Sequence, residues 1–354
     1  MAIYIQATAN ISPQKTFGRV PFLTEPVEYT GTRLKSIEPD YTSFIDVRSL
    51  RRMSRIIKMG VAAAMACLQE AGEKNPGAII TGTAFGCLED TGLFLTGIIE
   101  QNEEMLQPTP FIQSTHNTVG AQIALMLKCH EYNNTFVHRG FSFESALLDA
   151  LMLLHEGETT SVLAGSVDEI TDISHAILAR FGLYKRFPVS NLSLFNSASK
   201  GSIAGEGAAF FLLTSQPTVN AYAQLEGIST FYKPHDVIET EQHILSFLSS
   251  RQTNFDDIDL IITGRNGDTK GDSIYQQLEN SIFKNKSSIN YKHLCGEYST
   301  STSFALWLAA NIIKSGTAPA VTGYESLKGD KLKRILIYNH YQNIHHSLML
   351  VSAL

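Results

Sequence analysis

Apolar residues recur along this chain in two alternating patterns, one with the period of a helix and one typical of buried strands. Residues Arg51–Gly72 have apolar positions at helical spacing and end on a glycine suited to a C-terminal cap. Shorter apolar runs predict further strands and helices in alternation: strands at Ala78–Gly82, Thr135–Val137, Ser161–Gly165 and Ala208–Leu213, and helices at Ala121–Cys129 and Ser145–His155. Because helices and strands alternate, we expect an α/β fold built in layers.

Two segments far apart in the chain resemble each other. Ser145–Glu169 and Ser303–Glu325 both read as a buried helix, a glycine turn, a β-strand and a loop, and Gly165 aligns with Gly323 after a one-residue gap. The strand-and-loop sequences AIITGTAFG and LIITGRNGD also resemble one another. Two ordinary helix–turn–strand units that are alike by chance are the alternative, but the double match favours an internal duplication.

The predicted duplication divides the chain into an N-terminal half, residues 1–217, and a C-terminal half, residues 218–354. A chain of 354 residues with 44% hydrophobic residues has enough apolar material for a large core. The formal net charge is −6, so we expect no nucleic-acid partner that contacts the whole surface.

Neither targeting nor membrane signals are evident. No stretch approaches eighteen uninterrupted apolar residues, and the start MAIYIQATANISPQ lacks a basic region followed by an apolar run. We therefore expect no membrane partner. The cysteines are scattered and lack the spacing of metal ligands: Cys67, Cys87, Cys129 and Cys295. Cys67 is expected to be a buried residue of the first helix, whereas Cys87 lies in a loop and is a candidate for exposure. This usage indicates a reduced, cytoplasmic protein.

Four motifs then follow one another in a characteristic order. They are LRRMSR at Leu50–Arg55, PF…NTVG at Pro110–Gly120, LAGSVDE at Leu163–Glu169 and GSIAGEGA at Gly201–Ala208. As an ordered set they resemble the β-ketoacyl-ACP synthases, the condensing enzymes of the thiolase fold, over nearly the whole chain. The resemblance implies a thiolase-like fold in which two duplicated βαβαβ-type halves form a layered α-β-α-β-α architecture.

The chemistry of that family requires four parts. A cysteine at a helix N-terminus accepts the acyl chain as a thioester, because the helix dipole favours its thiolate. Two histidines donate hydrogen bonds to the enolate that forms as malonyl-ACP loses carbon dioxide. Two backbone N–H groups make an oxyanion hole. A lysine shortly before the second histidine supports the site electrostatically.

The nucleophile of this family has no counterpart here. Aligning Asp149–Ala150 with the family's helix places Gly140 at the cysteine, and the segment HRGFSFE contains no cysteine. Ser142 sits in a sequence that superficially resembles a nucleophile elbow. A first-turn serine that satisfies backbone groups is the simpler interpretation. His138 and Arg139 precede the position and are expected to fill the cavity or face a dimer partner.

Both histidines are also replaced. Anchoring on the Gly-Asp end of the loop Gly264–Asp272 puts Gly264 at the first histidine, or Arg265 or Asn266 if the loop contains a gap. The stretch KHLCGE matches the family's Lys…Gly-His segment, with the lysine retained as Lys292 and with Glu297 at the second histidine.

A glutamate cannot replace that histidine, because an ionised carboxylate only accepts hydrogen bonds and repels a developing enolate. Condensation by this chain alone is not expected. Decarboxylation-only relatives, which keep both histidines, are also a poor match.

The resemblance therefore favours a catalytically deficient homologue that acts as a chain-length-factor-like partner of an active ketosynthase. Such pairs serve type II polyketide, aryl polyene or fatty-acid-like biosynthesis with an acyl carrier protein. In that family the segment after Pro-Phe lines the partner's acyl tunnel, which makes tunnel-lining candidates of Phe111, Gln113, Thr115 and His116. For Phe111 an ordinary core position is the alternative. The strand that ends near Val137 is expected to pair with its counterpart across the two-fold axis.

Two other functions stay open. One is an acyl-transfer or thioester-hydrolysing enzyme that uses Ser142, His138 or Glu297. The other is a stand-alone homodimer that binds an acyl chain or an acyl carrier protein without turnover. The pair His345–His346 lacks further ligands at metal spacing, so we expect no metal, and the resemblance implies no cofactor.

Overall fold

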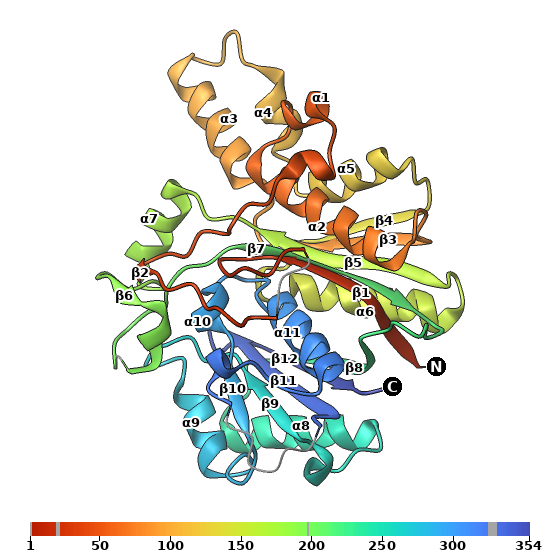
Figure 1. Ribbon diagram of the computed structural model, residues 1–354. Coiled ribbons are helices and arrows are strands. Elements are labelled where there is room, and N and C mark those ends of the chain that lie inside the picture. The colour runs from red at the N-terminus through yellow and green to blue at the C-terminus, as the bar shows by residue number, and fades with distance from the viewer. Residues whose placement is uncertain (1, 19–21, 197, 325–330) are drawn as a thin grey trace.

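The computed structural model describes residues 2–18, 22–196, 198–324 and 331–354. Within them, ten strands form one sheet in the order β10-β9-β11-β12-β8-β1-β7-β5-β3-β4 (Figure 1). The strands are β1 Ile3–Ile11, β3 Ala78–Gly82, β4 Tyr132–Phe136, β5 Ser161–Asp168, β7 Gly207–Thr214, β8 Ala223–Tyr232, β9 Leu260–Thr263, β10 Ser288–Asn290, β11 Arg334–Tyr341 and β12 His345–Ser352. A separate two-stranded ribbon pairs β2, Thr30–Gly31, with β6, Val189–Ser190.

The ten strands fall into two groups of five with the same topology. In each group the strands run from the outer edge inward as third, second, fourth, fifth and first in chain order. The first three positions pair in parallel and the others antiparallel in both groups. Strands β1 and β8 join the groups through a short antiparallel pairing. This repetition confirms the predicted duplication, while the boundary between residues 217 and 218 stays a prediction.

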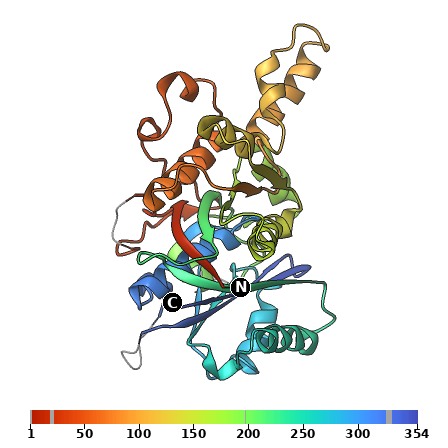
Figure 2. The same cartoon turned by 90° about the vertical axis from the view of Figure 1, so that its right-hand side faces the viewer.

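Helices form three layers around these strands. Helices α6, Ser142–Glu156, and α11, Thr302–Ser315, lie between the two groups, where α6 packs on β3 and β5 and α11 packs on β7 and β11. Helix α2, Arg55–Ala71, and α5, Thr118–Leu127, cover the first group from outside, as Figure 2 also shows. Helices α8, Val237–Ser250, and α9, Ser273–Asn280, cover the second group from outside. The result is the expected α-β-α-β-α order.

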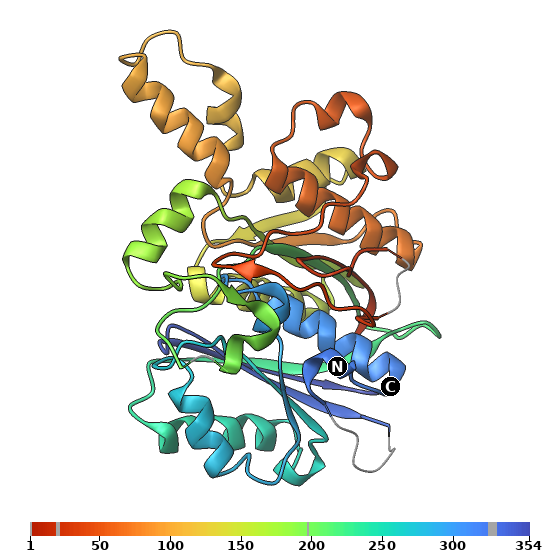
Figure 3. The ribbon, with the colours of Figure 1, turned by 60° about the vertical axis from the view of Figure 1, so that its left-hand side comes forward.

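The remaining helices are short or project from the layers. They are α1 Val47–Leu50, α3 Leu88–Glu100, α4 Pro108–Gln113, α7 Asp172–Arg180 and α10 Lys292–Cys295, with 3-10 turns at Tyr41–Ser43, Arg139–Phe141, Asn191–Asn196, Phe255–Asp257 and Ala320–Thr322. Helices α3 and α4 form a hairpin that extends away from the body of the molecule (Figure 3). Across the described ranges, no helix combines the length and the apolar character needed to cross a membrane.

Most of the predicted elements are confirmed, but two predictions need correction. The expected strand within Ser303–Glu325 is wrong: after α11 the chain makes the 3-10 turn Ala320–Thr322 and ends it on Gly323 with a φ of 77°. Pro319, which has no N–H group to donate, precedes this turn, and the topological counterpart of β5 is β11. Glu325 lies outside the described residues.

The helix predicted over Arg51–Gly72 is the second correction, since α2 begins only at Arg55 after a break that follows α1. Gly72 does cap this helix, with a φ of 70°.

Two of the sequence motifs, and the residue that follows a third, meet at an ion pair with a fully buried carboxylate. The guanidinium of Arg55, at the start of α2, donates to both carboxylate oxygens of Glu206 at 2.8 and 2.6 Å. The same carboxylate accepts the backbone N–H groups of Ser36 and Ile170. Its neighbour Gly205 has no space for a side chain, because a Cβ there would lie 2.1 Å from a carbonyl oxygen. The motifs therefore form a structural clip that joins the β5 and β7 ends to α2.

Candidate functional site

The position of the missing nucleophile lies in the turn between β4 and α6. Gly140 is buried in the 3-10 turn that precedes α6, and a Cβ on it would lie 3.0 Å from the imidazole of His345. That imidazole also packs edge-on against the rings of Phe141 and His138, at centroid distances of 4.8 and 5.3 Å. An aromatic cluster therefore covers Gly140, the residue that the sequence alignment places at the family's thiol.

The polar residues around this turn have structural contacts. Ser142 is fully buried, and its hydroxyl accepts the backbone N–H of His138 at 2.8 Å. The imidazole of His138 stacks on Phe141, and the exposed guanidinium of Arg139 lies 5.5 Å from the centre of the Phe85 ring. The serine hydroxyl therefore accepts a backbone hydrogen bond of the turn, as the interpretation of Ser142 as a first-turn serine expects.

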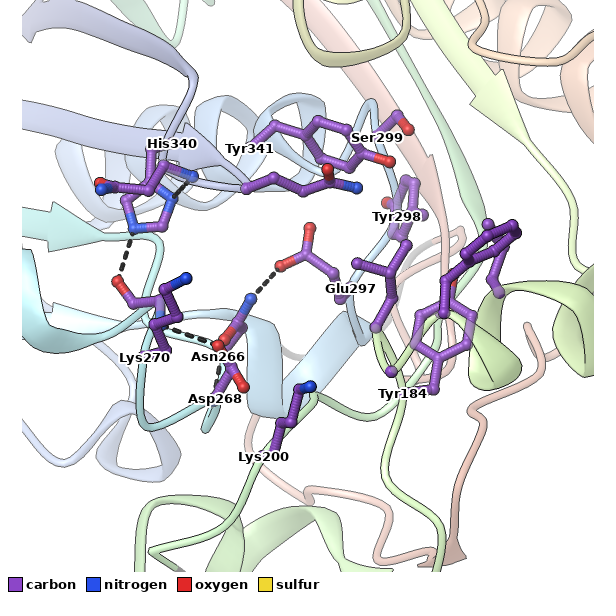
Figure 4. A pocket seen from close by; sticks show the side chains of 18 of the residues that line it. Tyr184, Lys200, Asn266, Asp268, Lys270, Glu297, Tyr298, Ser299, His340 and Tyr341 are labelled. Atoms are coloured by element: carbon purple, nitrogen blue, oxygen red, sulfur yellow. Dashed lines mark hydrogen bonds between the residues drawn. The ribbon is translucent and has the colours of Figure 1, made fainter. Parts of the chain in front are cut away.

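The counterparts of the other catalytic residues do come together. Lys292, at the start of α10, donates from Nζ to Oε2 of Glu297 at 2.7 Å. Asn266 donates from Nδ2 to the same oxygen at 2.6 Å, as Figure 4 shows. Lys292 is only 1% exposed. The amide of Asn266 is oriented, because its Oδ1 accepts the N–H of Asp268 at 3.0 Å. Its own backbone N–H is held by Asp272 at 2.9 Å.

The structure distinguishes the three candidates for the first histidine position by what surrounds them. A Cβ on Gly264 would lie 2.1 Å from Oδ1 of Asn339, so this position has no space for a side chain. Arg265 turns towards Glu279, 3.3 Å away. Asn266 is the candidate that contacts Glu297, which is the arrangement that a gap in the loop produces.

The backbone on both sides of Glu297 fixes its place. Its N–H donates to the carbonyl of Ile203 at 2.8 Å, and its carbonyl accepts the N–H of Gly205 at 2.9 Å. Gly296, with a φ of 77°, packs against Gly205 too closely for either residue to carry a side chain. The glycine-rich motif is therefore a structural support for Glu297.

A cavity of about 750 Å³ opens in front of the cluster formed by Lys292, Asn266 and Glu297. Its wall includes Asn266 and Glu297, with Tyr341 from the end of β11 and with Leu178 and Phe181 from the region of α7. A second cavity of about 800 Å³ lies between α7 and the α3–α4 hairpin. Both cavities have Glu169 in their walls, and burial raises the pKa of this carboxyl to about 7.

The four candidate tunnel residues lie elsewhere, on α4 and the loop that follows it. Phe111 is 57% exposed and packs against the ring of Phe94, so the alternative of an ordinary core position is wrong for the isolated chain. Gln113 donates to the backbone carbonyl of Arg52. The hydroxyl groups of Thr115 and Thr118 are 2.8 Å apart, and His116 packs against Gly86. Neither large cavity has any of the four candidates in its wall.

The sequence profile described as "Beta-ketoacyl synthase, N-terminal domain" matches residues 32–210, just over half of the chain. The chain belongs to the β-ketoacyl synthase family. No curated protein matches the sequence significantly. The fold is similar to the ishigamide ketosynthase/chain length factor, with a TM-score of 0.81, 14% identity, and coverage of 100% of this chain and 99% of that chain.

Two further solved structures share this fold. One is AntDE:AntF, a type II polyketide synthase acyl-carrier protein in complex with its ketosynthase bound to the hexaketide, with a TM-score of 0.73, 15% identity and coverage of 100% and 99%. The other is the ketosynthase ApeO in complex with its chain length factor ApeC from Xenorhabdus doucetiae, with a TM-score of 0.75, 15% identity and coverage of 99% and 98%. These likenesses establish the thiolase-like ketosynthase fold.

Measured against the chemistry of β-ketoacyl synthases, the site keeps the lysine and loses its donors to an enolate. Glu297, which the sequence alignment places at the family's second histidine, presents a carboxylate, and the side-chain amide of Asn266 donates to that carboxylate. Neither Cys87 nor Cys295 is placed to substitute for the nucleophile, since Cys295 is fully buried and Cys87 is 1% exposed, contrary to the exposure considered for it. Burial raises the pKa of both thiols, which disfavours the reactive thiolate.

No sequence motif marks Glu144, although it is an ionisable side chain inside the core. It lies on the first turn of α6, fully buried, and accepts a hydrogen bond from Ser347 of β12 at 3.0 Å. Burial raises its pKa to about 7. Its position in the first turn of a largely apolar helix was the only signal. In the described part of the chain, no three His, Cys, Asp or Glu residues are placed to hold a metal ion.

Proposed function

We propose that this chain is a non-catalytic, chain-length-factor-like subunit that associates with an active ketosynthase in a polyketide or aryl polyene pathway. The observation that carries this proposal is the nucleophile position. Gly140 offers no atom for acylation, and the imidazole of His345 lies where a side chain would project. Lys292 and Glu297, paired with each other, are not arranged to stabilise an enolate.

The surface around β4 supports association through the sheet. This strand is the last of its group, so one row of its backbone N–H and C=O groups is open to a further strand. Large apolar side chains are exposed on β4 and beside it: Leu125, Tyr132, Val137 and Met152. An open edge with an apolar margin is the surface that a two-fold related subunit would cover.

The titles of the structural neighbours support the nature of the partners. ApeO is described in complex with its chain length factor, and AntDE in complex with an acyl-carrier protein. By analogy, the partners of this chain would be a ketosynthase and the carrier protein that serves it, in the cytoplasm. The candidate tunnel residues would then line the partner's cavity, which accounts for the exposure of Phe111.

Co-expression with the cognate ketosynthase tests this function. We expect a 1:1 complex that survives gel filtration. The substitutions Leu125→Arg and Val137→Arg place a charge beside β4 and should abolish the complex. Ile238→Arg is the matched control, because the exposure of Ile238 lies between those of Leu125 and Val137, but the residue is on α8, in the outer layer of the other group. A chain that stays monomeric beside the ketosynthase at micromolar concentration, or a complex equally sensitive to all three changes, would refute the proposal.

A further inference from the structure

We propose that Glu297 is an internal carboxylate that occupies a carboxylate-binding site made by Lys292 and Asn266, and so closes the cavity to ligands that carry a carboxylate. This inference deepens the proposed loss of catalysis and rests on it for its biological meaning. Glu297 then acts as an internal ligand, and the anion site is preserved behind it.

Two donors converge on one oxygen of Glu297. The ammonium of Lys292 lies 2.7 Å from Oε2 and the amide nitrogen of Asn266 lies 2.6 Å from it. Hydrogen bonds of this kind, with an ionised acceptor, are among the strong ones in proteins. The asparagine cannot exchange its nitrogen for its oxygen without losing the N–H of Asp268 from Oδ1. The donors are therefore preorganised for a carboxylate.

Glu297 separates the ammonium of Lys292 from the cavity. Glu297 and Asn266 belong to the cavity wall, whereas Lys292 is 1% exposed and lies behind the glutamate. In Figure 4 the carboxylate of Glu297 lies between Asn266 on one side and Tyr341 on the other. Shortening the glutamate to a methyl group would extend the cavity of about 750 Å³ to the ammonium of Lys292.

A buried ammonium without a counter-ion is costly, so the opened site should recruit one. Among the described residues, the ion pair of Lys292 within 4.0 Å is the one with Glu297. The carboxyls of Glu144 and Asp272 are also within electrostatic reach of Lys292. Glu144 is committed to Ser347 and Asp272 to the backbone of the loop after β9. A small carboxylate from solution is the group that fits the vacated place.

The test is chemical rescue of Glu297→Ala by acetate or malonate, followed by thermal unfolding of the isolated chain. Sodium chloride at the same ionic strength is the reference. We expect both carboxylates to raise the melting temperature of Glu297→Ala saturably and to leave the native chain unchanged. The double variant Lys292→Met/Glu297→Ala should bind acetate at least about tenfold more weakly than Glu297→Ala, as expected for a lost charge-assisted hydrogen bond.

The matched control is Glu226→Ala. The side chain of Glu226 is 11% exposed, against 12% for Glu297, and pairs with Arg334 at 3.1 Å, but lines neither large cavity. Acetate should not rescue this variant. An equal rise in the native chain or in Glu226→Ala, or no rise in folded Glu297→Ala, would overturn the inference.

If Glu297→Ala does not accumulate as folded protein, its refolding yield in acetate is compared with that in chloride. Equal yields would overturn the inference. Because all these measurements use the chain alone, their failure leaves the association with a ketosynthase to its own test.

Discussion

Replacing Glu144 by glutamine should stabilise the protein above neutral pH and have little effect in acid. Burial raises the pKa of Glu144 from 4.5 to about 7, so the folded state retains the proton over a range in which the unfolded chain releases it. Because the unfolded chain releases this proton at lower pH than the folded state does, the free energy of unfolding falls progressively as pH rises through this range. A glutamine side chain at this position would keep an oxygen for the hydroxyl of Ser347 and carry no charge.

The size of the effect follows from that range. Each pKa unit corresponds to about 1.4 kcal/mol, so a rise from 4.5 to about 7 amounts to about 3 kcal/mol of stability lost by the native chain between pH 4 and pH 8. The free energy of unfolding of Glu144→Gln should lack this loss. The variant should thus be more stable than the native chain by about 3 kcal/mol at pH 8 and by less than about 1 kcal/mol at pH 5.

Urea unfolding at a series of pH values and one protein concentration measures the difference. Glu103→Gln is the control for removal of a carboxylate, because Glu103 is exposed on the α3–α4 hairpin. A stability difference that does not change with pH would show that Glu144 does not titrate within this range. A variant that is less stable at pH 8 would show that the carboxylate is stabilised by its surroundings, and either result would refute the reasoning.

Two further predictions concern the structural clip and the segment from Gln113 to His116. Arg55→Ala leaves the buried carboxylate of Glu206 without its counter-ion and should lower the free energy of unfolding by about 3 to 5 kcal/mol in urea unfolding; an effect below about 1 kcal/mol would contradict the clip. In the complex with the ketosynthase, Gln113→Ala or His116→Ala should lengthen the product by one or more extension units as measured by mass spectrometry. Met105→Ala, at the exposed tip of the same hairpin, should leave the product unchanged, and unaltered length in all three variants would remove the tunnel role.

Much of the fold follows from the sequence because its elements are marked by local physical signals. The strands β3, β5 and β7 are mostly apolar and are buried on both faces, which is the pattern that a covered sheet requires. The C-terminal cap at Gly72 needed only the left-handed conformation that glycine favours. A strand was wrongly predicted in the segment that contains Ala320–Thr322, because a short apolar run with a proline is compatible with either a strand or a tight turn.

The sequence alone could show which catalytic residue types are missing from the candidate site, but not how the remaining side chains contact one another. Gly140 could be placed from the flanking helix, and its lack of a side chain carries the main conclusion. The choice among Gly264, Arg265 and Asn266 depended on whether the loop contains a gap, and the pattern of apolar and polar residues does not indicate where a loop has a gap. The contact between Asn266 and Glu297 needed the backbone pairing of two distant segments. The burial of Cys87 likewise arises from tertiary packing at the start of α3.

Intact-protein mass spectrometry of the reconstituted pair tests the central claim most directly. This chain and the cognate ketosynthase are incubated together with acyl-ACP, and in parallel with the ketosynthase inhibitor cerulenin, and the mass of each subunit is then measured. The account predicts a stoichiometric adduct on the ketosynthase and none on this chain, because Gly140 offers no nucleophile and Ser142 is buried with its hydroxyl in the turn. A stoichiometric adduct on this chain that maps to Ser142, Cys87 or Cys295 would contradict it.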